Sequence, residues 1–198
     1  MFTGIIKAIG TISEVSAKGT DKTFIIDAGK LDLSDTIAGD SICVSGVCLT
    51  VVEMTGNGFS TDVSNETLSC TTFAEFQPGD QVNLEKSLRL NDLLGGHLVS
   101  GHVDCVGILK NISEDSRSVR FEFTVPDTIA KYICRKGSVS VDGVSLTVNE
   151  IYGDTFSVNI IPHTLHETIF STYKTGTRVN IEADLIARYL ERLVNAPN

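Results

Sequence analysis

The sequence lacks a basic run, a long apolar run and a Cys-X-X-Cys pair. Its 16 Lys and Arg residues against 25 Asp and Glu residues give a formal net charge of −9. The chain therefore lacks the clustered Lys and Arg residues that a surface for binding nucleic-acid phosphates requires. The longest uncharged apolar stretch, residues 41–52, is far shorter than the roughly 20 residues that cross a bilayer. We therefore expect no nucleic-acid binding and no insertion into a membrane.

The cysteines do not have the spacing of a structural framework. An odd number without a Cys-X-X-Cys pair argues against a disulfide scaffold and a zinc ribbon, so most should be small buried hydrophobic residues. The first ten residues, MFTGIIKAIG, supply neither a basic leader nor a long apolar segment with a small-residue cleavage site. These absences predict a soluble, cytoplasmic protein. The five cysteines are Cys43, Cys48, Cys70, Cys105 and Cys134.

The two halves of the chain repeat one another at an offset of 97 residues. FTGIIKAIG at residues 2–10 falls on VSGHVDCVG, and residues 41–53 fall on residues 138–150 with eight identities in thirteen. FSTDVSNETL likewise falls on FSVNIIPHTL, and GDQVNLE falls on GTRVNIE. Four blocks in one register, without a gap, indicate an internal duplication.

Short alternating or β-branched runs dominate each half. Runs such as SVRFEFTV and QVNLEKSL, separated by the turn signals TGNG, PGD and YGD, favour a small antiparallel barrel over a βαβ sheet. The segment KSLRLNDLLGG, residues 86–96, links the halves. The C-terminal EADLIARYLERLVN predicts a helix whose apolar stripe needs a partner, either the chain's own barrels or a neighbouring copy. That stripe comprises Leu185, Ile186, Tyr189, Leu190 and Leu193.

A short polar pair recurs in the repeated strand. Cys48 and Thr50 should share one face of an extended strand, while their neighbours point to the other face. Ser145 and Thr147 occupy the same places in the second half. One copy would fit an outer barrel face as well as a small-molecule site, but two copies favour the site. The glycine before each pair suggests a bulge or a close approach of another group.

All four histidines lie in the second half, as HLVSGH and HTLH. On strands, spacings of five and three place the members of each pair on opposite faces, so we expect no bound metal. His102 is matched by Ile5 in the first half, and Cys48 is matched by Ser145. The two strongest proton-transfer or nucleophile candidates thus each occur in one half only.

Eight ordered motifs resemble the α-type riboflavin synthases of the lumazine-binding family along essentially the whole chain. These motifs are MFTGII, GDSICVSGVCLTV, DVSNET, GDQVNLE, GGHLVSGHVD, KGSVSVDGVSLTVN, IIPHT and RVNIEADLIARYLERL. The resemblance implies an all-β chain of two six-stranded Greek-key barrels, residues 1–97 and 98–184, and a trimerisation helix, residues 185–198. It further implies a homotrimer, with possible association with lumazine synthase.

The resemblance also implies the reaction. Two molecules of 6,7-dimethyl-8-ribityllumazine dismutate by transfer of a four-carbon unit, which gives riboflavin and 5-amino-6-(ribitylamino)uracil. No metal and no separate redox cofactor are called for. A C7-methyl carbanion delocalised into the lumazine ring needs a base and a water-poor site, and His102 is expected to shuttle the proton while Cys48 contacts the reacting carbons.

The resemblance assigns site residues motif by motif. The first-half site would comprise Gly4, Ile5, Ile6, Cys48, Leu49, Thr50, Asp62, Val63, Ser64, Asn65, Glu66 and Thr67. The second-half site would comprise Gly101, His102, Val103, Lys136, Ser145, Leu146, Thr147, Ile161, Pro162, His163, Thr164, Leu165 and His166. The residues expected near the reacting carbons are Cys48, His102, Phe2, Ser41, Thr67 and Asp184. Asp62 also fits a turn or edge carboxylate, and helix capping alone would explain Asp184.

Two other functions fit parts of the pattern. A lumazine-binding optical protein of the same family would hold one ligand without turnover, but such proteins look degraded in GGHLVSGH and in the second-half site, which this sequence keeps. A purely structural double Greek-key protein would not need Cys48, His102 or the repeated polar pairs. The motifs therefore favour the enzyme.

Overall fold

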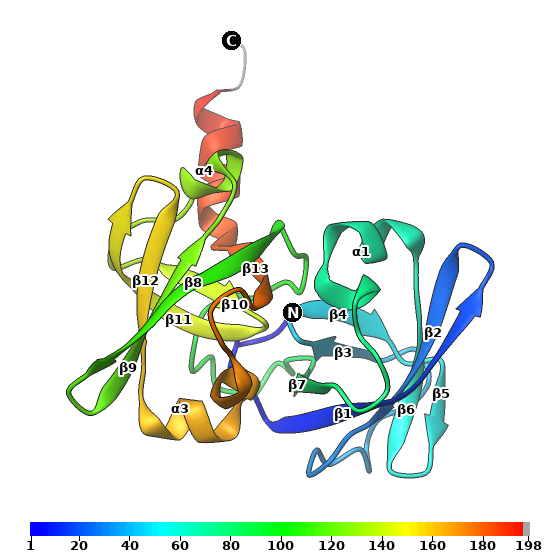
Figure 1. Ribbon diagram of the computed structural model, residues 1–198. Coiled ribbons are helices and arrows are strands. Elements are labelled where there is room, and N and C mark those ends of the chain that lie inside the picture. The colour runs from blue at the N-terminus through cyan, green and yellow to red at the C-terminus, as the bar shows by residue number, and fades with distance from the viewer. Residues whose placement is uncertain (196–198) are drawn as a thin grey trace.

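Each half of the chain folds into the same series of strands in the computed structural model, which describes residues 1–195 (Figure 1). The first half contains β1 (Ala8–Lys18), β2 (Asp21–Asp27), β3 (Ser41–Val44), β4 (Val47–Thr50), β5 (Glu53–Thr55), β6 (Gly58–Val63) and β7 (Gln81–Lys86). The second half contains β8 (Cys105–Asp115), β9 (Ser118–Thr124), β10 (Ser138–Val141), β11 (Val144–Tyr152), β12 (Thr155–Ile160) and β13 (Arg178–Ala183). The helices are α1 (Asn65–Cys70), α2 (Asp127–Ala130), α3 (Pro162–Glu167) and α4 (Leu185–Val194), with short 3-10 turns η1 (Thr72–Ala74) and η2 (Ile169–Thr172).

The two sheets share one topology. The second half is a closed barrel in the order β10-β11-β12-β9-β8-β13, and the first half is a sheet in the order β4-β3-β7-β1-β2-β6-β5. Strands β4 and β5 are the two pieces of the strand that corresponds to β11. Across the break, the Val52 amide donates to the Ser60 carbonyl at 2.9 Å and the Thr61 hydroxyl donates to the Thr50 carbonyl at 2.9 Å. The expected all-β fold of two repeats is confirmed, with a closed six-stranded barrel in the second half and, in the first, a barrel-like sheet whose edges β4 and β5 come from one divided strand.

The duplication holds at the level of strand register. The ladder between β1 and β2 shifts between Ile12 and Glu14, and the ladder between β8 and β9 shifts between Leu109 and Asn111, which are the same places in the repeat. A bulge kept in both halves bends each barrel in the same way. The two halves are therefore copies of one backbone as well as of one sequence pattern.

Each barrel has its own aromatic core. Phe24, Phe59 and Phe73 are fully buried in the first, and a second apolar cluster fills the other barrel around Phe121 and Phe123. Fully burying one such side chain stabilises the fold by roughly 1.5–3 kcal/mol, so the two cores can hold the barrels largely independently.

Asparagine side chains join the halves in a twofold pattern. The Asn83 amide donates to the Asp142 carbonyl at 2.9 Å, and the equivalent Asn180 amide donates to the Ser45 carbonyl at 2.8 Å. Each contact becomes the other when 97 is added to one residue number and subtracted from its partner's. Their amide oxygens each accept a backbone N–H from the opposite half, from Ile169 and Thr72 respectively. This reciprocity is the signature of an isologous interface.

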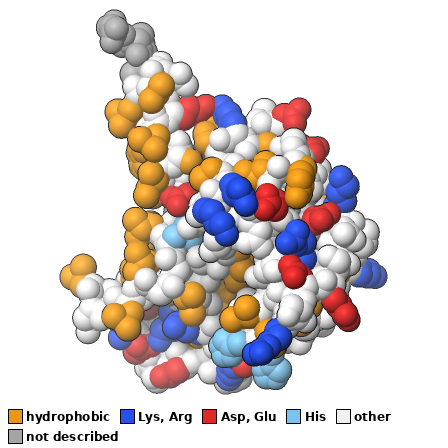
Figure 2. All heavy atoms as spheres, turned by 90° about the vertical axis from the view of Figure 1, so that its left-hand side faces the viewer, with side chains coloured by type: hydrophobic (Ala, Val, Ile, Leu, Met, Phe, Trp, Pro, Cys, Tyr) orange, Lys and Arg blue, Asp and Glu red, His pale blue; other side chains and the backbone are white. Residues whose placement is uncertain are grey.

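The terminal helix α4 projects from the second barrel (Figure 1). Its outer face carries Ile186, Tyr189, Leu190 and Leu193, which are between 56% and 72% exposed, whereas Leu185 is half-buried. Figure 2 shows an apolar band that runs along this projection. The final three residues of the predicted helix, 196–198, lie outside the described residues. None of the helices within residues 1–195 has the length and apolarity needed to span a bilayer.

Asp142, on the junction, gives the fold a testable pH dependence. It is 4% exposed and accepts hydrogen bonds from the Tyr173 hydroxyl and the Asn180 amide, yet burial raises its pKa from 3.8 to about 7. Because the folded state holds this proton more tightly than the unfolded state, the stabilisation is complete below pH 4 and is lost as the pH rises through 7.

We expect Asp142→Asn to remove this dependence. Between pH 4 and pH 8, the free energy of unfolding of the parent should fall relative to the variant by up to about 4 kcal/mol. Urea titrations of both proteins at several pH values measure the difference. Parallel stability curves for the two proteins would show that Asp142 does not titrate in this range.

Candidate functional site

The opening segment of each half lies against the polar strand of the other half. The Cys48 amide donates to the Gly101 carbonyl at 2.8 Å, and the Ser145 amide donates to the Gly4 carbonyl at 2.8 Å. Each candidate site is therefore built from both halves of the chain. The predicted grouping by halves is wrong for these segments: Gly4, Ile5 and Ile6 lie with Ser145, and Gly101, His102 and Val103 lie with Cys48.

Packing and backbone geometry also show that the two opening segments, residues 4–6 and 101–103, are exchanged, since each lies against the barrel of the other half. Val103 packs on the core of the first barrel, and Ile6 packs on the core of the second. Gly4 and Gly101 have φ values of 77° and 79°, and a Cβ at Gly101 would lie 2.6 Å from the Cβ of Cys48. Only glycine allows this approach of backbone to strand.

Two buried carboxylates hold the exchanged segments in place. Glu85 on β7 accepts hydrogen bonds from the amides of Thr3 and Gly4 at 2.8 and 2.9 Å. Glu182 on β13 accepts the equivalent bonds from Ser100 and Gly101 at 2.7 and 2.9 Å. Both side chains are 2% exposed. Burial raises the pKa of Glu85, and the hydrogen bonds from Thr3 and Gly4 oppose that rise.

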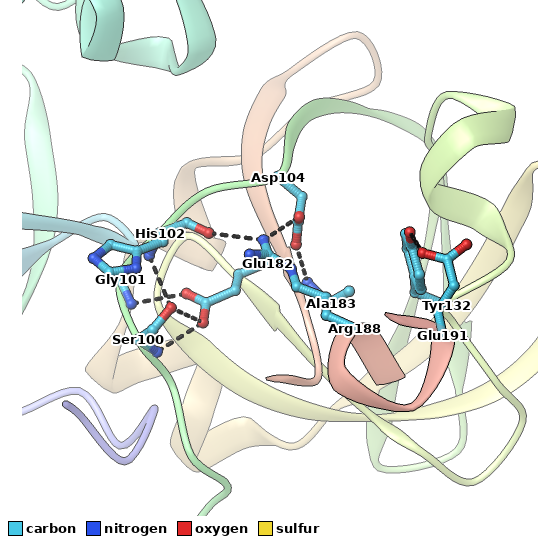
Figure 3. Close-up of polar contacts among 9 residues, drawn as sticks. All are labelled: Ser100, Gly101, His102, Asp104, Tyr132, Glu182, Ala183, Arg188 and Glu191. Atoms are coloured by element: carbon cyan, nitrogen blue, oxygen red, sulfur yellow. Dashed lines mark hydrogen bonds and ion pairs between the residues drawn. The ribbon is translucent and has the colours of Figure 1, made fainter. Parts of the chain in front are cut away.

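The first site brings Cys48 and His102 together on adjacent backbone. Cys48 is partly accessible and Thr50 is exposed on the outer face of β4, whereas Leu49 is buried beneath, which confirms the predicted alternation. Ser41 faces Thr50 across the β3–β4 ladder. The His102 ring is exposed, and Figure 3 shows it turned away from the Glu182 carboxylate. Residues with a thiol, a hydroxyl and an imidazole thus lie on adjoining backbone segments at one edge of the first barrel.

The second site has a different polar group in place of that imidazole. Ser145 and Thr147 repeat the outward pattern of β11 over the buried Leu146, and Nδ1 of His97 lies 2.6 Å from the Ser145 hydroxyl oxygen. His97 is 8% exposed, burial lowers its pKa, and its Nε2 has no partner within the described residues. A neutral imidazole can therefore accept the serine proton or hold the hydroxyl toward a ligand.

Beside the first site, a capped helix follows β6. Ser64 caps α1 by accepting the Thr67 amide at 3.2 Å, and Val63 is buried in the core. Asn65 and Glu66 are exposed on the first turn of α1. Asp62 instead forms a surface ion pair with Lys18 at 2.6 Å.

The equivalent stretch of the second half carries two histidines. The segment HTLH lies on α3, which begins at Pro162 after Ile161, so the prediction that these histidines sit on a strand is wrong. His166 contacts Glu167 at 2.8 Å, and Glu167 also pairs with Lys30 of the first half. The remaining predicted members lie on the same helix: His163 is exposed, and Thr164 and Leu165 are half-buried. Within residues 1–195, no cluster of acidic, histidine or cysteine side chains is arranged to hold a metal.

Three predicted residues lie at the edges of these sites. Phe2 is fully buried where the halves meet, with its amide donating to the Val99 carbonyl at 2.7 Å. Asp184 caps α4 by accepting the Ile186 amide at 3.0 Å. Lys136 is exposed in the loop before β10 with a left-handed φ of 67°.

The two carboxylates and His97 were not among the predicted site residues. The repeated V-N-[LI]-E run holds the signal for the former, because the same asparagine and glutamate recur inside otherwise apolar strands of both halves. His97 has no counterpart in the repeat, so comparison of the halves could not identify it.

Comparisons with known proteins identify the duplicated domain. The lumazine binding domain matches residues 3–87 and again residues 100–184. Riboflavin synthase of Photobacterium phosphoreum is 48% identical over 98% of this chain and 89% of its own length, and that of Bacillus subtilis (strain 168) is 42% identical over 100% and 92%. The crystal structure of LumP complexed with riboflavin has a TM-score of 0.86 at 28% identity and covers 92% of this chain and 99% of LumP. LumP complexed with 6,7-dimethyl-8-(1'-D-ribityl) lumazine has a TM-score of 0.83 at 27% identity and covers the same shares.

The exchanged segments predict which substitution damages which site. Gly101→Ala should weaken ligand binding at the Cys48 site, and Gly4→Ala should weaken it at the Ser145 site, each by about tenfold or more, because backbone strain alone costs roughly 1–2 kcal/mol. Calorimetric titration with riboflavin measures both sites.

Gly153→Ala is the matched control, since Gly153 has a φ of 62° and no atom within 4 Å of an added Cβ. The control should keep both affinities. Loss of the same site in Gly4→Ala and Gly101→Ala would contradict the exchange.

Proposed function

Because the chain belongs to the riboflavin synthase family, with two lumazine-binding domains, we propose that it makes riboflavin by dismutation of 6,7-dimethyl-8-ribityllumazine. One substrate molecule gives a four-carbon unit and the other accepts it. The products are riboflavin and 5-amino-6-(ribitylamino)uracil. The chain is a transferase, and we propose that it works in the cytoplasm.

One observation carries this function: two sites of the same plan differ at the positions that can do chemistry. Cys48 and the His102 segment form one site, whereas Ser145 and His97 form the other. Two identical substrates need two similar binding sites, and the opposite roles of donor and acceptor need a difference between them. A binding or structural protein would need no such difference.

The protein's own groups suit this chemistry. Backbone amides and carbonyls at the strand ends can hold the pteridine edge, and the exposed Thr50 and Thr147 hydroxyls can bind ribityl oxygens. The C7 methyl is acidic because its carbanion delocalises into the ring, so a positioned base is sufficient. His102 takes that proton at one site. Holding two substrates in register supplies much of the rate enhancement.

We also propose a homotrimer in which sites of neighbouring chains face each other. The exposed apolar face of α4, defined by Ile186, Tyr189, Leu190 and Leu193, is the kind of surface that a second copy covers. The opposite side of α4 is fixed to its own barrel, since Glu191 accepts from Lys131 and the Tyr132 hydroxyl. A helix anchored on its polar side and apolar on the other can dock without moving its barrel.

The likeness to LumP favours a second candidate, a protein that binds lumazine without turning it over. Full-length identity to the two riboflavin synthases is well above that to LumP, and the His102 segment is intact and held by Glu182. These features support the enzyme over the binding protein.

Incubation with pure 6,7-dimethyl-8-ribityllumazine should produce riboflavin. Absorbance at visible wavelengths follows the reaction, and chromatography should show one pyrimidine product for each riboflavin formed. Stoichiometric binding of lumazine with no riboflavin would establish the binding protein instead.

Mixing two damaged variants should restore activity if sites pair between chains. Gly4→Ala and Gly101→Ala each weaken one site per chain, so each parent should be strongly impaired at substrate concentrations near the parental KM. After subunit exchange, random association puts two intact sites together at roughly a quarter of interfaces. Activity at that level supports pairing between chains, and parental activity after exchange confirmed by mass spectrometry refutes it.

A further inference from the structure

Two segments lie outside the repeat, and each contacts a different site. His97, which directly follows the linker, lies against Ser145 in the second site. The terminal helix α4 places Arg188 against the His102 segment of the first site, where its guanidinium donates to the His102 carbonyl at 3.2 Å. The two sites are thus completed by unrelated parts of the chain.

Arg188 and Asp104 form a group of polar contacts on the C-terminal side of His102, which we call the lock (Figure 3). The Asp104 carboxylate accepts from the Ala183 amide at 2.8 Å through one oxygen and from Arg188 through the other. The Asp104 side chain is 10% exposed and that of Arg188 is 33% exposed, so the carboxylate is largely shielded from water while the guanidinium is partly accessible. One guanidinium therefore holds both residue 102 and residue 104 to the first turn of α4.

His102 is consequently fixed from two directions. Glu182 binds the amides of Ser100 and Gly101 before it, and Arg188 binds the backbone carbonyl of His102 itself. Gly101 lies between them with a φ of 79°, a conformation that gives the chain little resistance to rotation. Without Arg188, Asp104 would still be held by its bonds to Ile181 and Ala183, but the His102 carbonyl would lose its hydrogen bond.

The barrel fold does not require this lock. The backbone bond from Asp104 to the Ile181 carbonyl, 2.8 Å, recurs in the first half from Lys7 to Leu84 at 2.9 Å. At the position equivalent to Asp104, however, the first half has Lys7, which cannot pair with a guanidinium. The lock is present only where the segment carries a histidine.

We propose that Arg188 is a positioning residue for the reaction: it ties the His102 segment to α4 and so sets the direction of the imidazole at the first site. This inference rests on the proposed function. The orientation of His102 at the first site would then depend on the position of α4. At the second site, the group that contacts Ser145 is His97, beside the linker.

The test compares Arg188→Gln with Arg192→Gln, a matched change on an exposed position of the same helix. Arg188→Gln should lower kcat by about tenfold, within the range that misplacing a reacting group by less than 1 Å produces, with little change in KM. Arg188→Lys should recover part of the loss, because one ammonium can pair with Asp104 but does not reproduce the planar fork. Arg192→Gln should match the parent.

Hydrogen exchange supplies a readout independent of turnover. Amides of residues 100–106 should exchange faster in Arg188→Gln and not in Arg192→Gln, at unchanged oligomeric mass. Should the unpaired Asp104 unfold the variant, Asp104→Asn combined with Arg188→Gln removes the buried charge and should give the same two changes. Parental kcat and exchange in these variants would overturn the proposal. If the parent itself makes no riboflavin, the proposed function fails, and the exchange data still decide whether the lock exists.

Discussion

Two buried glutamates hold the opening segments on which both sites depend. Taking a carboxylate out of water costs several kcal/mol, and charge-assisted hydrogen bonds of roughly 1.5–3 kcal/mol each must offset that cost. Glu85 and Glu182 each receive such bonds from successive backbone amides of an opening segment. The same bonds hold those segments where they can reach the opposite barrel. Replacing either carboxylate would release a segment and lose a site together.

Symmetry and its departures explain how one fold serves two roles. The barrels, the bulges and the asparagine contacts are repeated, so both sites offer the same cradle. The differences that bear on chemistry include Cys48 against Ser145, His102 against Ile5, and the unmatched His97 and Arg188. These side chains take no part in the barrel cores or in the asparagine contacts between the halves. They could therefore differ between the two sites without disturbing the fold.

Much of the architecture could be predicted from periodicity. The offset of 97, the barrel in each half and the outward direction of Cys48 and Thr50 follow from local patterns, and the structure has all of them. The exchange of segments could not be predicted, because contacts between residues such as Gly4 and Ser145 leave no mark on local sequence. The short helix that carries HTLH was not predicted, although it begins at Pro162, a residue favoured at the first helical position. The pair of Asp104 and Arg188 also could not be predicted, because the two residues are far apart in the sequence and neither belongs to a recognisable local pattern.

The reciprocal contacts between the halves have a historical consequence. Every such pair, Asn83 with Asp142 and Asn180 with Ser45 among them, would exist unchanged between two separate copies of a single barrel related by a twofold axis. An ancestor of half the present length could therefore have worked as a homodimer that exchanged opening segments, with two identical sites. Joining the two genes freed one copy to change without the other. A histidine could then arise in one opening segment while isoleucine stayed in its counterpart, so that equal partners became a donor side and an acceptor side.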